Sequence, residues 1–380
     1  MALLCMAAMF AFAACGGDDD ESGGGSGGGS AAASGDASKQ GAEASGESLT
    51  LPDGLTAGIL HVQGNAQSDQ LIGYALTDAL DALGVEYEER DPQGNPGKTA
   101  TDLDALIGRD PDVIFGISVE AATIQSQLRR MADRGIPFIN VGGTIRDSPL
   151  VALSPVPSDY AQAALASQYL LDLLASENEE QPGTPAGKVA TFGFDPIYSL
   201  LQRRQTFELM AEQNKGVEIV AQHQVNFEDP NADIQGATQD IVQANPDLKA
   251  IYTCCDFTLP PIAAGLRQAN ATDKVKVVSV QLGTPAALDL VENGSVTAVG
   301  NAALGASSWM AVDEWARAVA EDREICRDCW HKYEQMFAYD MVAQDNLDVS
   351  YELRPDFVVQ RLVVDYPAFF TAKWTEEFGL

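Results

Sequence analysis

The sequence predicts an α/β protein with two lobes, each built on a parallel sheet that has helices on both faces. Short apolar runs alternate with segments whose apolar residues recur at helical spacing, which is the pattern of successive β-α-β units. The chain from residue 49 onwards is longer than one typical domain of about 100–200 residues. A proline-containing segment at 151–159 interrupts the alternation and divides it into two runs.

The first run begins with residues 55–62, a mostly apolar stretch that is typical of a strand covered on both faces. Residues 69–83 repeat apolar side chains at helical spacing until Gly84, which ends the predicted helix. The remaining elements predicted for this run are strands at 85–89, 112–118 and 136–141 and helices at 101–109 and 121–134.

The two prolines of segment 151–159 forbid a helix and disfavour a central strand, so we interpret it as a crossing between lobes. An ordinary loop within one large sheet is the alternative. The second run then has strands predicted at 189–193, 217–224, 250–253, 275–280 and 296–300, with helices at 160–174, 198–213, 232–244, 260–269 and 285–292. Ligands of such parallel sheets bind at the carboxyl ends of the strands.

In the C-terminal third we expect a helix at 306–319 returning to the first lobe, a third crossing strand within 351–364 and an amphipathic helix at 367–378. The predicted first lobe is therefore 51–155 with 302–345. The predicted second lobe, with a C-terminal tail, is 156–301 with 346–380.

The N-terminal residues resemble a lipoprotein leader. An apolar run of about 14 residues is too short to cross a bilayer, which needs roughly 20, and is typical of a signal peptide. Ala13, Ala14 and Cys15 resemble the bacterial lipobox, which predicts a signal peptide at 1–15 and lipidation of Cys15. Phe12 and the lack of a preceding Lys or Arg depart from that pattern, and a buried helix with an incidental cysteine is the alternative.

Residues 16–50 are predicted to be a flexible linker rich in Gly, Ser and Asp. Residues 16–48 lack aromatic and β-branched side chains and cannot bury enough apolar surface to offset the entropy of ordering. The formal net charge of the whole chain is −32, which disfavours nucleic acid and anionic headgroups as partners and is a weak argument against an anionic ligand. Membrane contact is therefore expected through the lipid alone.

Four segments of the second run resemble one family in their order and spacing. They are residues 244–252 (ANPDLKAIY), Asp256, residues 277–285 (VVSVQLGTP) and residues 289–301 (DLVENGSVTAVGN). Over roughly residues 55–319 the chain resembles the ribose-binding-like, sugar-binding type I periplasmic binding proteins. The resemblance implies two Rossmann-like lobes joined by a three-strand hinge, which close over a sugar or sugar-like solute and deliver it to the permease of an ABC importer.

The same resemblance implies an extracytoplasmic monomer without cofactor, metal or covalent chemistry. Repressors that share the core carry an N-terminal helix-turn-helix, whereas this chain has an apolar leader and a tether there. A receptor that presents its ligand to a kinase or chemoreceptor shares every feature seen here and stays open as an alternative.

The resemblance places candidate ligand-binding residues at the strand ends of both lobes. They are Asn65, Ser68, Asp69, Glu120, Phe194, Tyr198, Asp256, Gln281 and Asn301. Phe194 and Tyr198 are candidates to replace an aromatic platform that the loop after the first strand has lost, although core packing is their alternative. The alternative role of Ser68 and Asp69 is helix capping. The alternative role of Asp256 is to hold its own loop in place.

The chain departs from the family pattern at several of these places. Gly142 and Gly143 replace an Asp-Arg pair, Cys255 replaces an asparagine and Gln281 replaces a sugar-binding aspartate. Arg203 matches an arginine whose family role is mostly structural. The missing charges predict that ribose is not the ligand.

Cys254, Cys255, Cys326 and Cys329 are the cysteines expected in the mature chain, and an oxidising compartment predicts disulfides among them. Cys326 and Cys329 are spaced for a local bridge. Cys254 and Cys255 have two open alternatives, a vicinal disulfide or bridges to the later pair. The three histidines are too scattered for a zinc site, and the sequence motifs of hydrolases, P-loop proteins, dinucleotide-binding enzymes and zinc proteases do not occur. We therefore expect no enzymatic activity.

Overall fold

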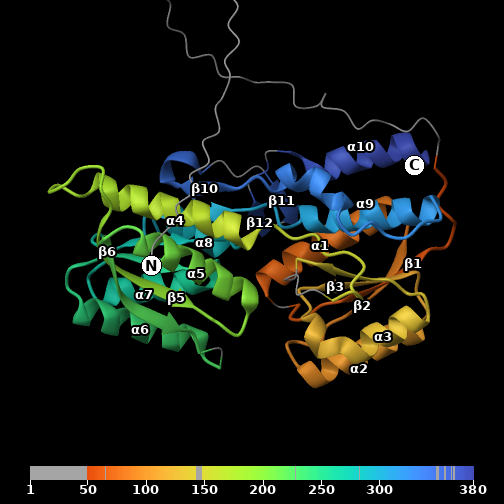
Figure 1. The fold of residues 1–380 in the computed structure, drawn as a ribbon, viewed down its shortest axis with the longest axis horizontal. Coiled ribbons are helices and arrows are strands. Elements are labelled where there is room, and N and C mark those ends of the chain that lie inside the picture. The colour runs from red at the N-terminus through yellow and green to blue at the C-terminus, as the bar shows by residue number, and fades with distance from the viewer. Residues whose placement is uncertain are drawn as a thin grey trace, which may run out of the picture. The chain divides into compact units, whose positions relative to one another are not determined.

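The computed structural model describes residues 49–380 except 65, 143–147, 227, 282, 348–350, 355, 356, 361 and 363. The predicted leader, Cys15, the linker up to residue 48 and the candidate Asn65 lie outside the described residues. The described chain contains two extended, mostly parallel sheets with helices packed on their faces (Figure 1), so the predicted fold class is confirmed.

The first sheet has the strand order β2-β1-β3-β4, with all neighbours parallel. Its strands are β1 Thr56–Leu60, β2 Glu86–Arg90, β3 Val113–Ile117 and β4 Phe138–Val141, and its helices are α1 Gln67–Ala82, α2 Pro96–Gly108, the short 3-10 helix η2 Ala121–Ile124 and α3 Gln125–Asp133. Figure 1 shows α2 and α3 on one face of this sheet and α1 on the other. The β3 residues are all buried because helices cover both faces.

Helix α2 was predicted to begin at residue 101, but it begins at Pro96. The side chain of Asn95 accepts hydrogen bonds from the backbone N–H groups of Gly97 and Lys98, and proline is well suited to the first helical position because it has no N–H to satisfy. The Asn95 cap and the proline together start the helix before the residues in which apolar side chains recur at helical spacing.

The crossing segment first extends the edge of the first sheet. Leu153 forms a parallel bridge with Ile139 of β4, and the Asn140 N–H donates to the Leu153 carbonyl at 2.9 Å. Ser158 then caps helix α4, Asp159–Ser176, by accepting from the Ala161 N–H. This helix packs in the core of the second sheet, so segment 151–159 does connect the two lobes.

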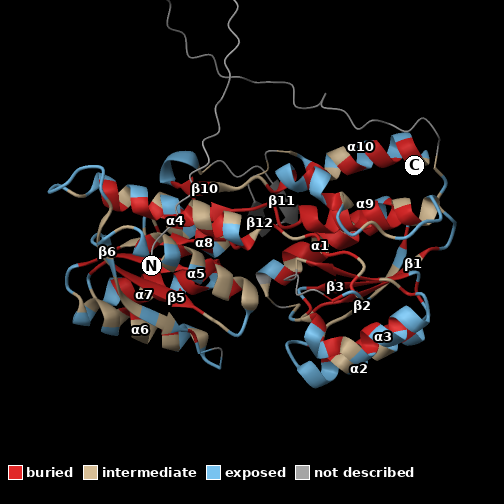
Figure 2. Ribbon diagram, in the orientation of Figure 1, coloured by how far each residue is buried: buried red, intermediate tan, exposed pale blue. Residues whose placement is uncertain are grey.

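The second sheet has the order β10-β9-β8-β7-β5-β6. Strands β5 Ala186–Gly193, β6 Gly216–Gln224, β7 Leu248–Thr253, β8 Lys276–Ser279 and β9 Ala298–Asn301 are parallel, and β10 Asp340–Ala343 pairs antiparallel with β9. Helices α4 and α5 (Tyr198–Glu212) contribute to the core on one face, and helices α6 (Pro230–Ala244), α7 (Leu259–Gln268) and α8 (Pro285–Glu292) to the core on the other. Figure 2 shows buried residues in the strands between these layers, and they dominate β5, β7, β8 and β9, whereas the edge strand β6 has none.

The C-terminal third departs from the predicted division of lobes. Strand β10 belongs to the second sheet, although residues 302–345 were predicted to lie in the first lobe. Residues 351–364 contain an antiparallel hairpin, β11 Tyr351–Arg354 with β12 Phe357–Gln360, instead of one crossing strand. Helix α9, Ala306–Ala320, and the 3-10 helices η4 (Cys329–Phe337) and η5 (Gln344–Asn346) complete this part of the chain.

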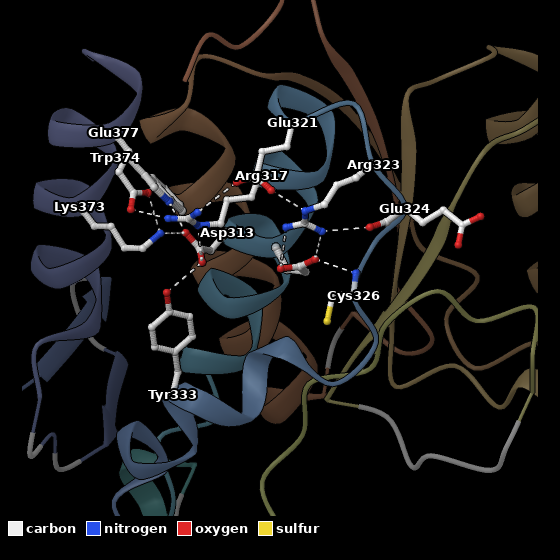
Figure 3. Close-up of polar contacts among 11 residues, drawn as sticks. Asp313, Arg317, Glu321, Arg323, Glu324, Cys326, Tyr333, Lys373, Trp374 and Glu377 are labelled. Atoms are coloured by element: carbon white, nitrogen blue, oxygen red, sulfur yellow. Dashed lines mark hydrogen bonds and ion pairs between the residues drawn. The ribbon is translucent and has the colours of Figure 1, made fainter. Parts of the chain in front are cut away.

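Helix α10, Tyr366–Phe378, packs on the first lobe, although 346–380 was predicted to belong with the second. Aromatic stacking supplies one reason. The ring centroid of Trp309 in α9 lies 5.2 Å from that of Trp374 and 6.2 Å from that of Phe370. A buried ionic network supplies the other (Figure 3). The Lys373 ammonium contacts Asp313 at 2.5 Å and Glu377 at 2.9 Å.

Candidate functional site

The carboxyl ends of the second-sheet strands carry a buried polar cluster centred on Arg203 of α5. The Nε of Arg203 donates to Asp159 Oδ1 at 2.7 Å, and Nη1 donates to Gln281 Oε1 at 2.5 Å and to the Cys254 carbonyl at 3.2 Å. The side chain therefore joins the start of α4 to the ends of β7 and β8. Only 6 % of Arg203 is exposed. Burial opposes its charge, but Asp159 outweighs burial and raises the pKa of Arg203 above its ordinary value.

Asp256 follows β7 in the short helix η3, Asp256–Thr258, and holds a neighbouring loop. Its Oδ2 accepts from the Gly283 N–H at 2.9 Å, and the Thr284 hydroxyl is a further partner. Burial raises the pKa of Asp256 to about 6, against the opposing effect of these hydrogen bonds. The sequence left two roles open for Asp256, ligand contact or the holding of its own loop. In the structure its carboxylate holds a loop, but this loop is the one that follows β8.

The first-sheet strand ends carry a second charged group, centred on His61 after β1. Its Nδ1 lies 2.5 Å from Asp69 Oδ1 and its Nε2 lies 3.0 Å from Glu89 Oε2. Burial lowers the pKa of His61, but the hydrogen bonds to the two carboxylates outweigh it and raise the pKa to about 9. The imidazole is thus a cation held between two anions at neutral pH.

Asp69 also shapes the loop that leads into α1. Its Oδ2 accepts from the backbone N–H groups of Val62 and Gln63, each at 3.1 Å. The N-cap of α1 is Ala66, which makes no side-chain cap, so Asp69 fixes the loop from within the first turn. Ser68 is exposed on the same turn.

The remaining candidate ligand-binding residues also lie near strand ends, but they differ in burial and in contacts. Glu120 follows β3 and is partly exposed. Phe194 packs beside Leu200 and the two adjacent cysteines, and Tyr198 is the first residue of α5. Asn301 is buried at the end of β9, where its Nδ2 donates to Asp340 Oδ1 of β10 at 2.8 Å.

The sequence interpretation missed two exposed aromatic residues at the edge formed by these second-sheet strand ends. Tyr160 is 55 % exposed and Phe257 is 37 % exposed. Each directly follows a buried carboxylate of the site, Asp159 or Asp256. That adjacency is the signal that was available in the sequence, because neighbouring side chains at a helix start point in different directions.

The two cysteine pairs differ. Cys326 and Cys329 are joined by a disulfide with a Cα–Cα distance of 5.4 Å. Cys254 and Cys255 carry free thiols whose sulfurs lie 3.1 Å apart. Bridges between the two pairs, one of the open alternatives, are therefore not formed.

Comparison with known proteins places the chain in one family. The family model described as periplasmic binding protein domain matches residues 57–321. The chain is 23 % identical over 223 residues to the ABC transporter periplasmic-binding protein YphF of Escherichia coli, a match that covers 57 % of this chain and 64 % of that protein. The match thus spans less than two thirds of the curated relative.

Two solved structures illustrate the shared fold. A carbohydrate transporter solute-binding protein from Agrobacterium radiobacter, in complex with D-arabinose, is 16 % identical with a TM-score of 0.64 over 78 % of this chain and 96 % of that one. A solute-binding protein of an ABC transporter from Bacillus halodurans, with bound myo-inositol, is 17 % identical with a TM-score of 0.63 over 80 % of this chain and 97 % of that one. The family resemblance noted from the sequence is confirmed.

Proposed function

This chain belongs to the periplasmic binding protein family, and on that premise we propose that it is the solute-binding protein of an ABC importer, with a sugar or sugar-like polyol as its ligand. The family and fold are those of extracytoplasmic proteins of solute transport. The observation that carries the proposal is the polar cluster around Arg203, which lies at the strand ends where parallel sheets bind ligands.

Gln281 is the residue of this cluster best suited to contact a hydroxyl group. Arg203 can only donate hydrogen bonds, so the side-chain oxygen of Gln281 must face it at 2.5 Å. This fixes the orientation of the amide and directs the NH₂ group of Gln281 away from the guanidinium, as a donor for a solute oxygen. Asp159 neutralises Arg203, so the cluster presents hydrogen bonds without a free positive charge.

A neutral ligand agrees with this arrangement and with the net charge of −32, which repels anions. The exposed rings of Tyr160 and Phe257 are suited to cover the apolar face of a sugar ring. Glu120, on the first lobe, would accept hydrogen bonds from hydroxyl groups. A solute held by both lobes would favour the closed arrangement of the two.

Attachment to the membrane would come from a lipid on Cys15, followed by the linker of residues 16–50. A random coil of that length spans roughly 30 Å on average, enough to let the lobes move at the membrane surface. Among the described residues, no helix is both long and apolar enough to cross a membrane.

Titration calorimetry of the full chain against D-arabinose, D-allose, myo-inositol and a panel of related sugars and polyols tests the proposal. At least one should bind, and ribose should not bind with submicromolar affinity. Gln281→Ala should weaken the binding by about 1–3 kcal/mol, a roughly 5- to 150-fold rise in Kd, because a desolvated hydrogen bond is lost. Gln213→Ala is the matched control, since this exposed glutamine lies at the far end of α5. A panel without any binder, or equal effects of the two variants, would contradict the proposal.

A further inference from the structure

Two adjacent thiols lie inside the second-lobe cluster. Cys254 and Cys255 directly follow β7 and are only 1 % and 5 % exposed. Their sulfurs are 3.1 Å apart, whereas a disulfide bond is about 2.05 Å long. A movement of about 1 Å would therefore bring the sulfurs to bonding distance.

The peptide group between the two cysteines belongs to the frame of the site. Its Cys254 carbonyl accepts from Arg203 Nη1 at 3.2 Å, and the carbonyl of the following peptide group, that of Cys255, accepts from the Thr258 hydroxyl at 2.6 Å. Arg203 holds Asp159 and Gln281 with its other donors. A rotation of this peptide group therefore moves an acceptor of Arg203, and through Arg203 it reaches Asp159 at the start of α4 and Gln281 after β8.

We propose that Cys254 and Cys255 form a reversible vicinal disulfide, and that its redox state sets the geometry of the Arg203 cluster. The effect on solute affinity rests on the proposed function. Closing the small ring rotates the peptide plane between the cysteines and turns the Cys254 carbonyl away from Arg203. The guanidinium then shifts relative to Gln281, whose amide is aligned by it.

The oxidant required is a disulfide of the extracytoplasmic space. One cysteine thiolate attacks the oxidant, forms a mixed disulfide with it and releases one thiol. The neighbouring thiolate then attacks the protein sulfur of that mixed disulfide, which forms the Cys254–Cys255 bond and releases the second thiol. The two protons lost by the cysteines pass to the two leaving thiolates, so one oxidant disulfide is reduced for each bond formed.

The covalent geometry makes such a bond easy to reduce. Consecutive Cα atoms are about 3.8 Å apart, below the usual Cα–Cα range of about 4.4–6.8 Å for disulfides, and strained disulfides have more oxidising potentials. Burial raises the pKa of the Cys255 thiol well above its ordinary value. Exchange should therefore be slow in the packed state and faster when the end of β7 opens.

The test compares full-length protein equilibrated with oxidised glutathione and with dithiothreitol. After alkylation and digestion, the peptide that contains residues 254–255 should be lighter by two hydrogen atoms, without alkyl groups, in the oxidised sample alone. Oxidation should also change amide hydrogen exchange in the first turn of α4 and at Gly283, a readout that needs no ligand. The affinity for a sugar identified by the calorimetric panel should change at least about fivefold.

Cys254→Ser/Cys255→Ser should abolish all three responses, and Cys326→Ser/Cys329→Ser, which removes the other pair, should retain them. Alkylation of both thiols after oxidation would overturn the proposal, and so would a bond that leaves hydrogen exchange unchanged. If the bond forms and exchange changes while no sugar binds in either state, the redox coupling stands and the proposed function fails.

Discussion

At the scale of single residues, the strand ends of both lobes are held by charges that satisfy one another. Arg203 is matched by Asp159 in the second lobe, and His61 is matched by Asp69 and Glu89 in the first. A buried charge is costly unless it is paired and hydrogen-bonded. These groups therefore fix the loops at the strand ends, and the proposed function assigns the ligand contacts to their neutral or partly exposed neighbours.

The pairing of His61 predicts a pH dependence of stability. Its pKa rises from 6.5 to about 9 on folding, so the folded state binds the proton more tightly than the unfolded chain. This contribution is complete below about pH 6.5 and is lost as the pH rises through about 9. Urea unfolding should show His61→Gln to be less stable than the wild type by about 1–3 kcal/mol at roughly pH 6.

The difference between the wild type and His61→Gln should shrink when the comparison is repeated at roughly pH 10. His331→Gln serves as the control, because His331 lies exposed on η4 and its substitution should cost little at either pH. A deficit of His61→Gln that is equal at both pH values would mean that the folded protein holds His61 neutral.

At the scale of elements, the attachment of α10 to the first lobe is the clearest case of packing and charge acting together. Asp313 of α9 accepts from Lys373, from Trp374 Nε1 at 2.9 Å and from the Tyr333 hydroxyl at 3.2 Å. Figure 3 shows these side chains converging on Asp313. Arg317 pairs with Glu377 of α10, so two cations balance two carboxylates across the helix pair.

Removing one charge from this network should be strongly destabilising. Lys373→Met leaves the two buried carboxylates of Asp313 and Glu377 with Arg317 but without the ammonium, and breaking a buried pair in this way costs about 3–5 kcal/mol. Denaturant unfolding should show this loss. Lys274→Met, at an exposed position of the second lobe, should change stability by less than about 0.5 kcal/mol. Equal stability of the two variants would show that α10 is held by its aromatic contacts alone.

The predicted N-terminal leader also has a direct test. Radiolabelled palmitate should enter the protein in a bacterial host. Cys15→Ala should abolish the incorporation because it removes the thiol to which the lipid is attached. Cys5→Ala is the matched control, since this cysteine lies within the predicted apolar region, and it should leave incorporation intact. Labelling that survives Cys15→Ala would refute the anchor.

At the scale of the whole molecule, the proposed function requires that a solute contact both lobes. Small-angle scattering should therefore show the wild type contracting when a binding sugar is added. Glu120→Ala should weaken that binding by about 1–3 kcal/mol through a lost hydrogen bond from the first lobe. Glu86→Ala, at the exposed amino end of β2, should not. Tight binding without contraction, and without loss in Glu120→Ala, would place the ligand elsewhere.

Several features of the site were open to prediction because they follow local rules. Polar residues at the ends of parallel strands gather at one edge of a sheet, and Asp256 and Gln281 do share such an edge with Arg203. The hydrogen-bond partners of each side chain could not be predicted. Arg203 contacts partners 44 and 78 residues away along the chain, and no sequence period records such pairs.

The sequence by itself determined the alternation of strands and helices, and therefore the two parallel sheets, because the periods of buried side chains follow local backbone geometry. It also determined the family, through segments whose order and spacing are maintained. Only the tertiary structure decided that α10 packs on the first lobe and that β10 joins the second sheet. Both depend on contacts between segments far apart in the chain. Strand β10 pairs with β9, and aromatic stacking and buried charge pairs with α9 hold α10 on the first lobe.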